Sequence, residues 1–136
     1  MHMGGMNLVM DDAGSARTGL SARAIGAANT PVDGGWVDRL NFMGALLIIQ
    51  ASGTAAGGLT VQLQHSVDNA GTGAANYGNP ATVSFGAGAT TTVQEMNVVL
   101  AGAKRFIRVR VTPTGTAAGT MSVALMLGHG NSAPMA

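Results

Sequence analysis

Alternating apolar and polar residues, interrupted by glycine every few positions, constrain the fold of this chain more than any other feature. In residues 59–65 the leucines and the valine occupy one face of an extended strand, and the threonine and glutamines occupy the other. A helix needs apolar residues three and four positions apart over about eleven residues, with little glycine. The 21 glycines among 136 residues leave no such stretch. The sequence therefore predicts an all-β domain.

The same reading predicts strands along most of the chain. Beyond residues 59–65, the segments expected to be strands are residues 21–25, 37–40, 43–51, 81–85, 90–100, 105–112 and 120–128. In residues 105–112 the side chains of Ile107, Val109 and Val111 are expected to point inward. Residues 43–51 are apolar except for Gln50, which is typical of a strand that is buried on both faces.

Turn-forming residues separate these strands, in clusters at residues 52–58, 68–73, 86–88 and 113–115. The sequence Gly-Thr-Ala-Ala-Gly occurs twice, at residues 53–57 and 115–119, and we interpret it as one hairpin turn used two times. About eight short strands without a helix predict a β-sandwich or a jelly roll over residues 20–128. Residues 1–19 and 129–136 lack periodicity and are expected to be flexible arms.

Charge is scarce: 13 of the 136 residues are charged, which is 10%, whereas a soluble domain usually has about 25%. The formal net charge is +1. A small monomer needs a charged exterior to stay dispersed, so the composition indicates that part of the surface is covered in an assembly. The absence of cysteine excludes disulfides, thiolate metal sites and thiol nucleophiles. No apolar run is long enough to span a membrane, and the N-terminus lacks signal-peptide features, so we expect an intracellular product or one released by lysis.

The sequence offers no arrangement of catalytic residues. The three histidines have no second histidine or carboxylate at metal-ligand spacing, and neither a nucleophile-elbow motif nor a phosphate-loop motif is present. Asp11 and Asp12 are adjacent, but they lie in the expected N-terminal arm. The prediction is a non-enzymatic protein without a cofactor or a metal.

One segment is basic, because four of the seven cations lie within residues 104–110. Its alternation places Phe106, Arg108 and Arg110 on the outward face. Such a face could bind single-stranded nucleic acid, but that mode needs more aromatic side chains than this strand has. An acidic protein partner is the favoured interpretation. Trp36, the only tryptophan, is predicted to lie in the core rather than to anchor an interface.

Several short motifs resemble a known family. They include Val-Asp-Gly-Gly-Trp at residues 32–36, Lys-Arg-Phe-Ile-Arg-Val-Arg-Val at 104–111 and Leu-Gly-His-Gly-Asn-Ser-Ala-Pro-Met-Ala at 127–136. Over residues 24–136 the chain resembles the small decoration, or cement, proteins of tailed-phage capsids, although it has fewer acidic residues near its turns than they do. The resemblance implies a jelly-roll sandwich that sits outside an icosahedral shell and bridges major capsid subunits. It brings no catalytic residues.

The sequence and this resemblance together predict a capsid decoration protein on the outer surface of the virion, made in the host cytoplasm. The expected partners are the major capsid protein and further copies of the chain, as a homodimer or homotrimer, with no membrane and no nucleic acid. The predicted contact residues are Phe106, Arg108, Arg110, Asp11 and Asp12. A tail or fibre-base component is the alternative within structural proteins. A carbohydrate-binding β-sandwich module is the alternative from another class.

Overall fold

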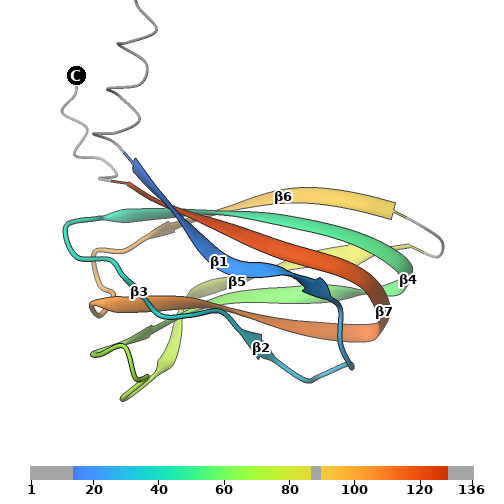
Figure 1. Cartoon of the computed structure of the whole chain (residues 1–136), viewed down its shortest axis with the longest axis horizontal. Coiled ribbons are helices and arrows are strands. Elements are labelled where there is room, and N and C mark those ends of the chain that lie inside the picture. Colours follow the sequence, from blue (N-terminus) through green and yellow to red (C-terminus); the bar gives the residue numbers. More distant parts are fainter. Residues whose placement is uncertain (1–13, 87–89, 129–136) are drawn as a thin grey trace, which may run out of the picture.

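A computed structural model describes residues 14–86 and 90–128, which form one antiparallel β-sheet without a helix (Figure 1). All-β antiparallel architecture is therefore confirmed for these residues. The strands are β1 (Gly14–Ala24), β2 (Val32–Asp33), β3 (Val37–Asp38), β4 (Gly44–Ser66), β5 (Ala75–Phe85), β6 (Thr90–Val99) and β7 (Phe106–Gly128).

Two long strands organise the molecule. β4 and β7 have 23 residues each and pair with each other from end to end. Both bend near the middle, so that one continuous sheet folds into two layers (Figure 1). The layer drawn at the top contains β1, residues 119–128 of β7, residues 44–53 of β4, and β6, and we call it the upper layer. The lower layer contains β2 and β3, residues 106–115 of β7, residues 57–66 of β4, and β5.

The core lies between the two layers and receives alternate side chains from both halves of each long strand. Ile107, Val109 and Val111 are fully buried, as the alternation predicted. Leu47 and Leu63, from the two halves of β4, are also fully buried. Removing each such side chain from water stabilises the fold by about 1.5–3 kcal/mol, which makes this row the main source of stability.

The predicted turns at residues 52–58 and 113–115 are wrong, because both segments lie inside the long strands. The two Gly-Thr-Ala-Ala-Gly sequences meet at the bend, where Gly53 pairs with Gly119 and Gly57 with Gly115. Gly119 has a φ of 129°, and a Cβ there would lie 1.9 Å from the carbonyl oxygen of Ser52. The repeated motif is therefore a site of backbone crowding at which two paired strands turn together between layers.

This continuity merges four of the eight predicted strands into two, and β2, which was not predicted, brings the number within the described residues to seven. The predicted strands at residues 43–51 and 59–65 are two halves of β4, and those at 105–112 and 120–128 are two halves of β7. Jelly-roll connectivity stays a prediction.

The boundary of the predicted N-terminal arm, residues 1–19, is also wrong. Residues 14–19 belong to β1, where backbone pairing with β7 compensates for their lack of sequence periodicity. Asp11 and Asp12, like the predicted tail at 129–136, lie outside the described residues.

Two predictions about burial are reversed in β4. Residues 43–51 were expected to be buried on both faces, but only alternate residues such as Leu47 and Ile49 are buried. Leu46 and Ile48 point away from the core and are half-buried, because no third layer covers them. Gln62 and Gln64 were expected on an open polar face, yet they are 9% and 6% exposed. Their amide groups donate hydrogen bonds to residues of the neighbouring strand β5, namely Tyr77, Gly78 and Asn76.

Candidate partner-binding surface

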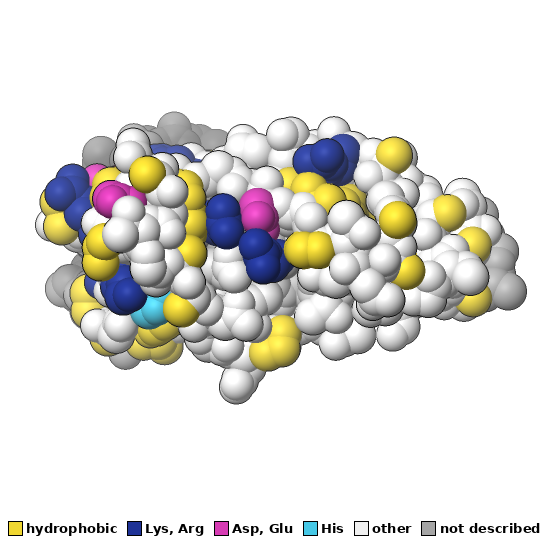
Figure 2. Space-filling model, turned by 90° about the horizontal axis from the view of Figure 1, so that it is seen from below, with side chains coloured by type: hydrophobic (Ala, Val, Ile, Leu, Met, Phe, Trp, Pro, Cys, Tyr) yellow, Lys and Arg dark blue, Asp and Glu magenta, His cyan; other side chains and the backbone are white. Residues whose placement is uncertain are grey.

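The outer face of the lower layer carries an ordered group of charged side chains. Arg108 and Arg110 point outward from β7, as predicted, and both approach Asp33 of β2. Arg110 donates two hydrogen bonds to the carboxylate, at 2.7 Å from Nε and 3.0 Å from an Nη atom. An Nη atom of Arg108 lies 3.5 Å from the same carboxylate. Figure 2 views this face from outside and shows Lys or Arg and Asp or Glu side chains side by side at its centre.

These contacts set the charge state of the group. Hydrogen bonds from Arg110, reinforced by the positive charge of Arg108, hold the pKa of Asp33 below its ordinary value despite partial burial. The same pairing raises the pKa of Arg110. With two guanidinium groups and one carboxylate, the group is fixed in geometry and keeps a net positive charge at neutral pH.

Arg108 also connects the group to the rest of the sheet. Its Nε donates a hydrogen bond of 2.9 Å to Oε1 of Gln64, whose amide nitrogen donates one of 2.9 Å to Asn76. The network therefore crosses β2, β7, β4 and β5 in turn. We call the surface formed by Asp33, Trp36, Gln64, Arg108 and Arg110 the arginine ladder. Because each polar group has a partner, the arginines are held in one orientation before any other molecule arrives.

Trp36 belongs to this surface, so its predicted place in the core is wrong. The side chain is half-buried, and it is absent from the cluster of buried apolar residues. The guanidinium carbon of Arg108 lies 4.4 Å from the centre of the indole ring, in cation–π contact. The other neighbour is Gly71, where a Cβ would come within 3.3 Å of the indole Nε1. Trp36 thus supports the arginine ladder from beside β3.

Phe106 lies at the start of β7 and is half-buried. The guanidinium carbon of Arg105 lies 5.4 Å from its ring centre, and Arg105 pairs with Asp38 at 2.7 Å. This exposed pair contributes little to stability, but it reduces the positive charge of the segment that the sequence marked as basic.

The structure therefore brings together three of the five predicted contact residues, Phe106, Arg108 and Arg110, on one face. Sequence reasoning missed Asp33, Gln64 and Asn76. No local signal could have identified Asp33, since it lies 77 residues before Arg110 and meets it only through the pairing of β2 with β7. The alternation did place Gln64 on the same face of its strand as Gln62, but not beside an arginine.

A second group of polar contacts holds the loop before β7. Arg39 donates hydrogen bonds to the carbonyl oxygens of Lys104, Phe42 and Ala103. The backbone nitrogen of Lys104 donates a hydrogen bond of 3.1 Å to Nδ1 of His65. His65 lies in β4, as the alternation predicted, and its ring centre lies 5.1 Å from that of Tyr77 on β5. The pKa of the His65 imidazole is lowered mainly by burial, and to a smaller extent by the positive charges of Lys104 and Arg39.

This contact predicts a pH dependence of stability. Folded His65 binds a proton less readily than it does in the unfolded chain, so protons favour unfolding as the pH falls through the unfolded value of about 6.5. We expect the free energy of unfolding to fall by about 0.5–1 kcal/mol between pH 7.5 and 5, roughly the worth of one partly exposed hydrogen bond. Urea unfolding at both pH values measures the change.

The His65→Gln variant is the control, and it should lose most of that dependence. The aspartates with lowered pKa values titrate below this pH window. A pH dependence that is equally large in the variant would contradict the assignment.

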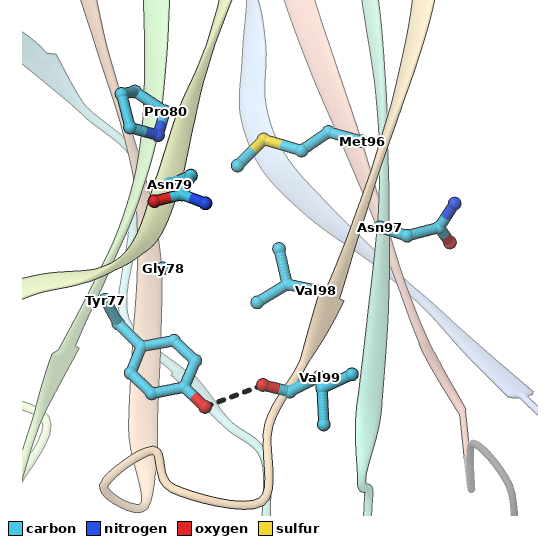
Figure 3. A pocket seen from close by; sticks show the side chains of 8 residues that line it. All are labelled: Tyr77, Gly78, Asn79, Pro80, Met96, Asn97, Val98 and Val99. Atoms are coloured by element: carbon cyan, nitrogen blue, oxygen red, sulfur yellow. Dashed lines mark hydrogen bonds between the residues drawn. The ribbon is translucent and has the colours of Figure 1, made fainter.

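A groove of about 530 Å³ separates the edges of β5 and β6 (Figure 3). Met96 and Val98 point into it from β6, while Asn97 points away. The hydroxyl of Tyr77 donates a hydrogen bond of 2.6 Å to the carbonyl oxygen of Val99 at one end. No histidine, carboxylate or cation lines the groove, and the hydroxyl of Tyr77, the one phenol in its lining, is engaged with Val99.

Within residues 14–86 and 90–128, no group of three or more histidine or acidic side chains could hold a metal ion. The same residues contain no helix with the length and apolar character needed to cross a membrane.

Comparisons with known proteins identify the fold only. No protein family profile matches the sequence. No curated protein matches it significantly either. Among solved structures, the chain is similar to the PBSX exported protein XepA, with a TM-score of 0.55 and 20% sequence identity. The match covers 85% of this chain and 37% of XepA, so this chain corresponds to somewhat more than a third of that protein.

Proposed function

We propose that this chain is a structural protein of a tailed bacteriophage, and specifically a decoration protein that binds the outside of the head and stabilises contacts between major capsid subunits. The observation that carries the proposal is the arginine ladder, a rigid, positively charged surface on a broad sheet face. Arginine and tryptophan in fixed positions are typical of the residues that dominate binding energy at protein interfaces. An acidic surface on the shell is the matching partner.

The fold and the motifs support the same class. One neighbour in fold is the PBSX exported protein XepA, which is phage-related. Motifs over residues 24–136 resemble those of capsid decoration proteins. A contact that is repeated many times on a shell needs little affinity per copy, because binding to the assembled state stabilises that state.

The carbohydrate-binding alternative has less support, because sugar recognition of this type uses exposed ring faces. Arg108 covers one face of Trp36, Tyr77 uses its hydroxyl to bind β6, and Phe85 is 5% exposed. A tail or fibre-base protein would use the same kind of surface. Only the location of the protein in the particle, on the head or on the tail, distinguishes the two roles.

Separated heads and tails of the phage that encodes this chain provide the first test. Mass spectrometry of each fraction is expected to find the protein on heads and not on isolated tails. Its presence in tail fractions alone would replace the decoration role with the tail or fibre-base role.

The arginine ladder itself is tested with the Arg108→Ser/Arg110→Ser double variant, added to heads that lack the protein. We expect binding about ten-fold weaker at low salt, with a smaller difference at high salt, because the lost attraction is between charges. The matched control is Arg23→Ser, which removes an exposed cation from β1 in the other layer. Equal loss in the control, or unchanged binding of the double variant, would remove the arginine ladder from the proposal. Circular dichroism confirms that both variants fold.

A further inference from the structure

We propose that the outer face of the upper layer is a docking surface for a second copy of this chain, so that two copies associate face to face about a two-fold axis. This face is opposite to the arginine ladder. The inference concerns the free protein, and it does not depend on a role in a capsid.

The face is nearly neutral, where the other outer face is charged, and it is apolar over the end of the layer away from the bend. There Leu46 and Ile48 of β4 and Met126 of β7 are half-buried, and Val99 of β6 is 71% exposed. Nearer the bend the outward side chains are polar, apart from Val93. Among the described positions that the register directs outward in this layer, Glu95 is the one ionisable group. Uncovered apolar surface of this kind marks an interaction site.

The sequence of β4 points to the same conclusion. Residues 45–49 are Ala-Leu-Leu-Ile-Ile, a pattern typical of a strand that is covered on both sides. Within one chain the core covers only Ala45, Leu47 and Ile49. A second sheet stacked at about 10 Å would cover Leu46 and Ile48 as well. The second copy therefore completes the burial that the sequence predicts and one chain lacks.

The face is large enough for a dimer. Its four strands, each about ten residues long, measure about 19 Å by 33 Å at the usual strand spacing and rise per residue. Two such faces bury roughly 1,200 Å² in total, at the lower end of the range for specific interfaces. A flat and nearly neutral face also matches a copy of itself without repulsion between like charges.

Sedimentation equilibrium of the full chain from about 1 to 100 µM tests the proposal, a range suited to an interface of modest size. The expected mass at high concentration is twice the chain mass of 13.5 kDa. The Ile48→Lys variant should raise the dissociation constant about ten-fold or more, because the interface would remove from water both the new ammonium group and Glu95, its cross-strand neighbour. The matched control is Thr112→Lys, on the outer face of the lower layer, which should dimerise like the unchanged chain.

A second variant keeps the test decisive if Ile48→Lys disturbs folding. Val93→Lys changes a position of β6 that is 59% exposed, and it should also weaken the dimer.

A chain that is monomeric over the whole range would overturn the proposal, as would a dimer that resists both lysine variants on this face. If the free chain is monomeric and Ile48→Lys and Val93→Lys abolish binding to phage heads, the occupant of the face is the shell and not a second copy.

Discussion

Replacing Gly119 by alanine is expected to destabilise the protein by about 3 kcal/mol or more, the sum of backbone strain and overpacking. The φ of 129° is one that residues with a Cβ rarely adopt. The added methyl carbon would also lie 1.9 Å from the carbonyl oxygen of Ser52, which is backbone and cannot rotate away. The bend must therefore open, and β4 and β7 must separate where they pass between layers. Urea unfolding followed by circular dichroism measures the loss.

Gly26→Ala is the matched control, because a Cβ at Gly26 would meet no atom within 4 Å and its φ is not positive. The stability of this variant should stay within about 0.5 kcal/mol of the unchanged chain. Similar losses in both variants would show that the bend does not depend on the absence of a side chain at Gly119.

The second large effect is expected in the core. Leu63→Ala should destabilise the protein by about 2–5 kcal/mol, because Leu63 is fully buried between the layers and its removal leaves a cavity. A loss of this size lowers the melting temperature by roughly 10 °C in a chain of this length. Leu40→Ala makes the same chemical change at a side chain that is 53% exposed.

The Leu40→Ala variant should change stability by less than about 0.5 kcal/mol. Thermal unfolding of the two variants side by side separates the cost of burial from the cost of losing a leucine. Equal melting temperatures would mean that the lower layer does not pack on the core as described.

Of the two proposed surfaces, the sequence predicted the arginine ladder only in part. The alternation in β7 was enough to place Arg108 and Arg110 outward, because strand periodicity is local. Their partner Asp33 and the stacking of Arg108 on Trp36 were not predictable, since both depend on β2 and β3 lying beside β7. The consequence is functional. Arg108 and Arg110 are not free cations, because both form ion pairs with the carboxylate of Asp33.

For the outer face of the upper layer, the sequence predicted more burial than the single chain shows. Residues 43–51 were predicted to be buried on both sides, and the single chain buries one. The single chain contradicts the prediction for the outer face, and under the dimer proposal a second copy covers that face. Scarce charge, 13 residues in 136, fits a protein whose exterior is divided between two contact surfaces.

By itself, the sequence determined the class of the fold, the inward rows of β4 and β7, and the lack of catalytic motifs, because each follows from periodicity or composition over a few neighbouring residues. Only the tertiary structure decided that the Gly-Thr-Ala-Ala-Gly segments are bends inside two long strands. A glycine-rich segment is compatible with either a turn or a crowded strand, and the choice depends on what packs against it. Here the deciding contact is between the two copies of the motif, which meet across the sheet more than 60 residues apart in the chain.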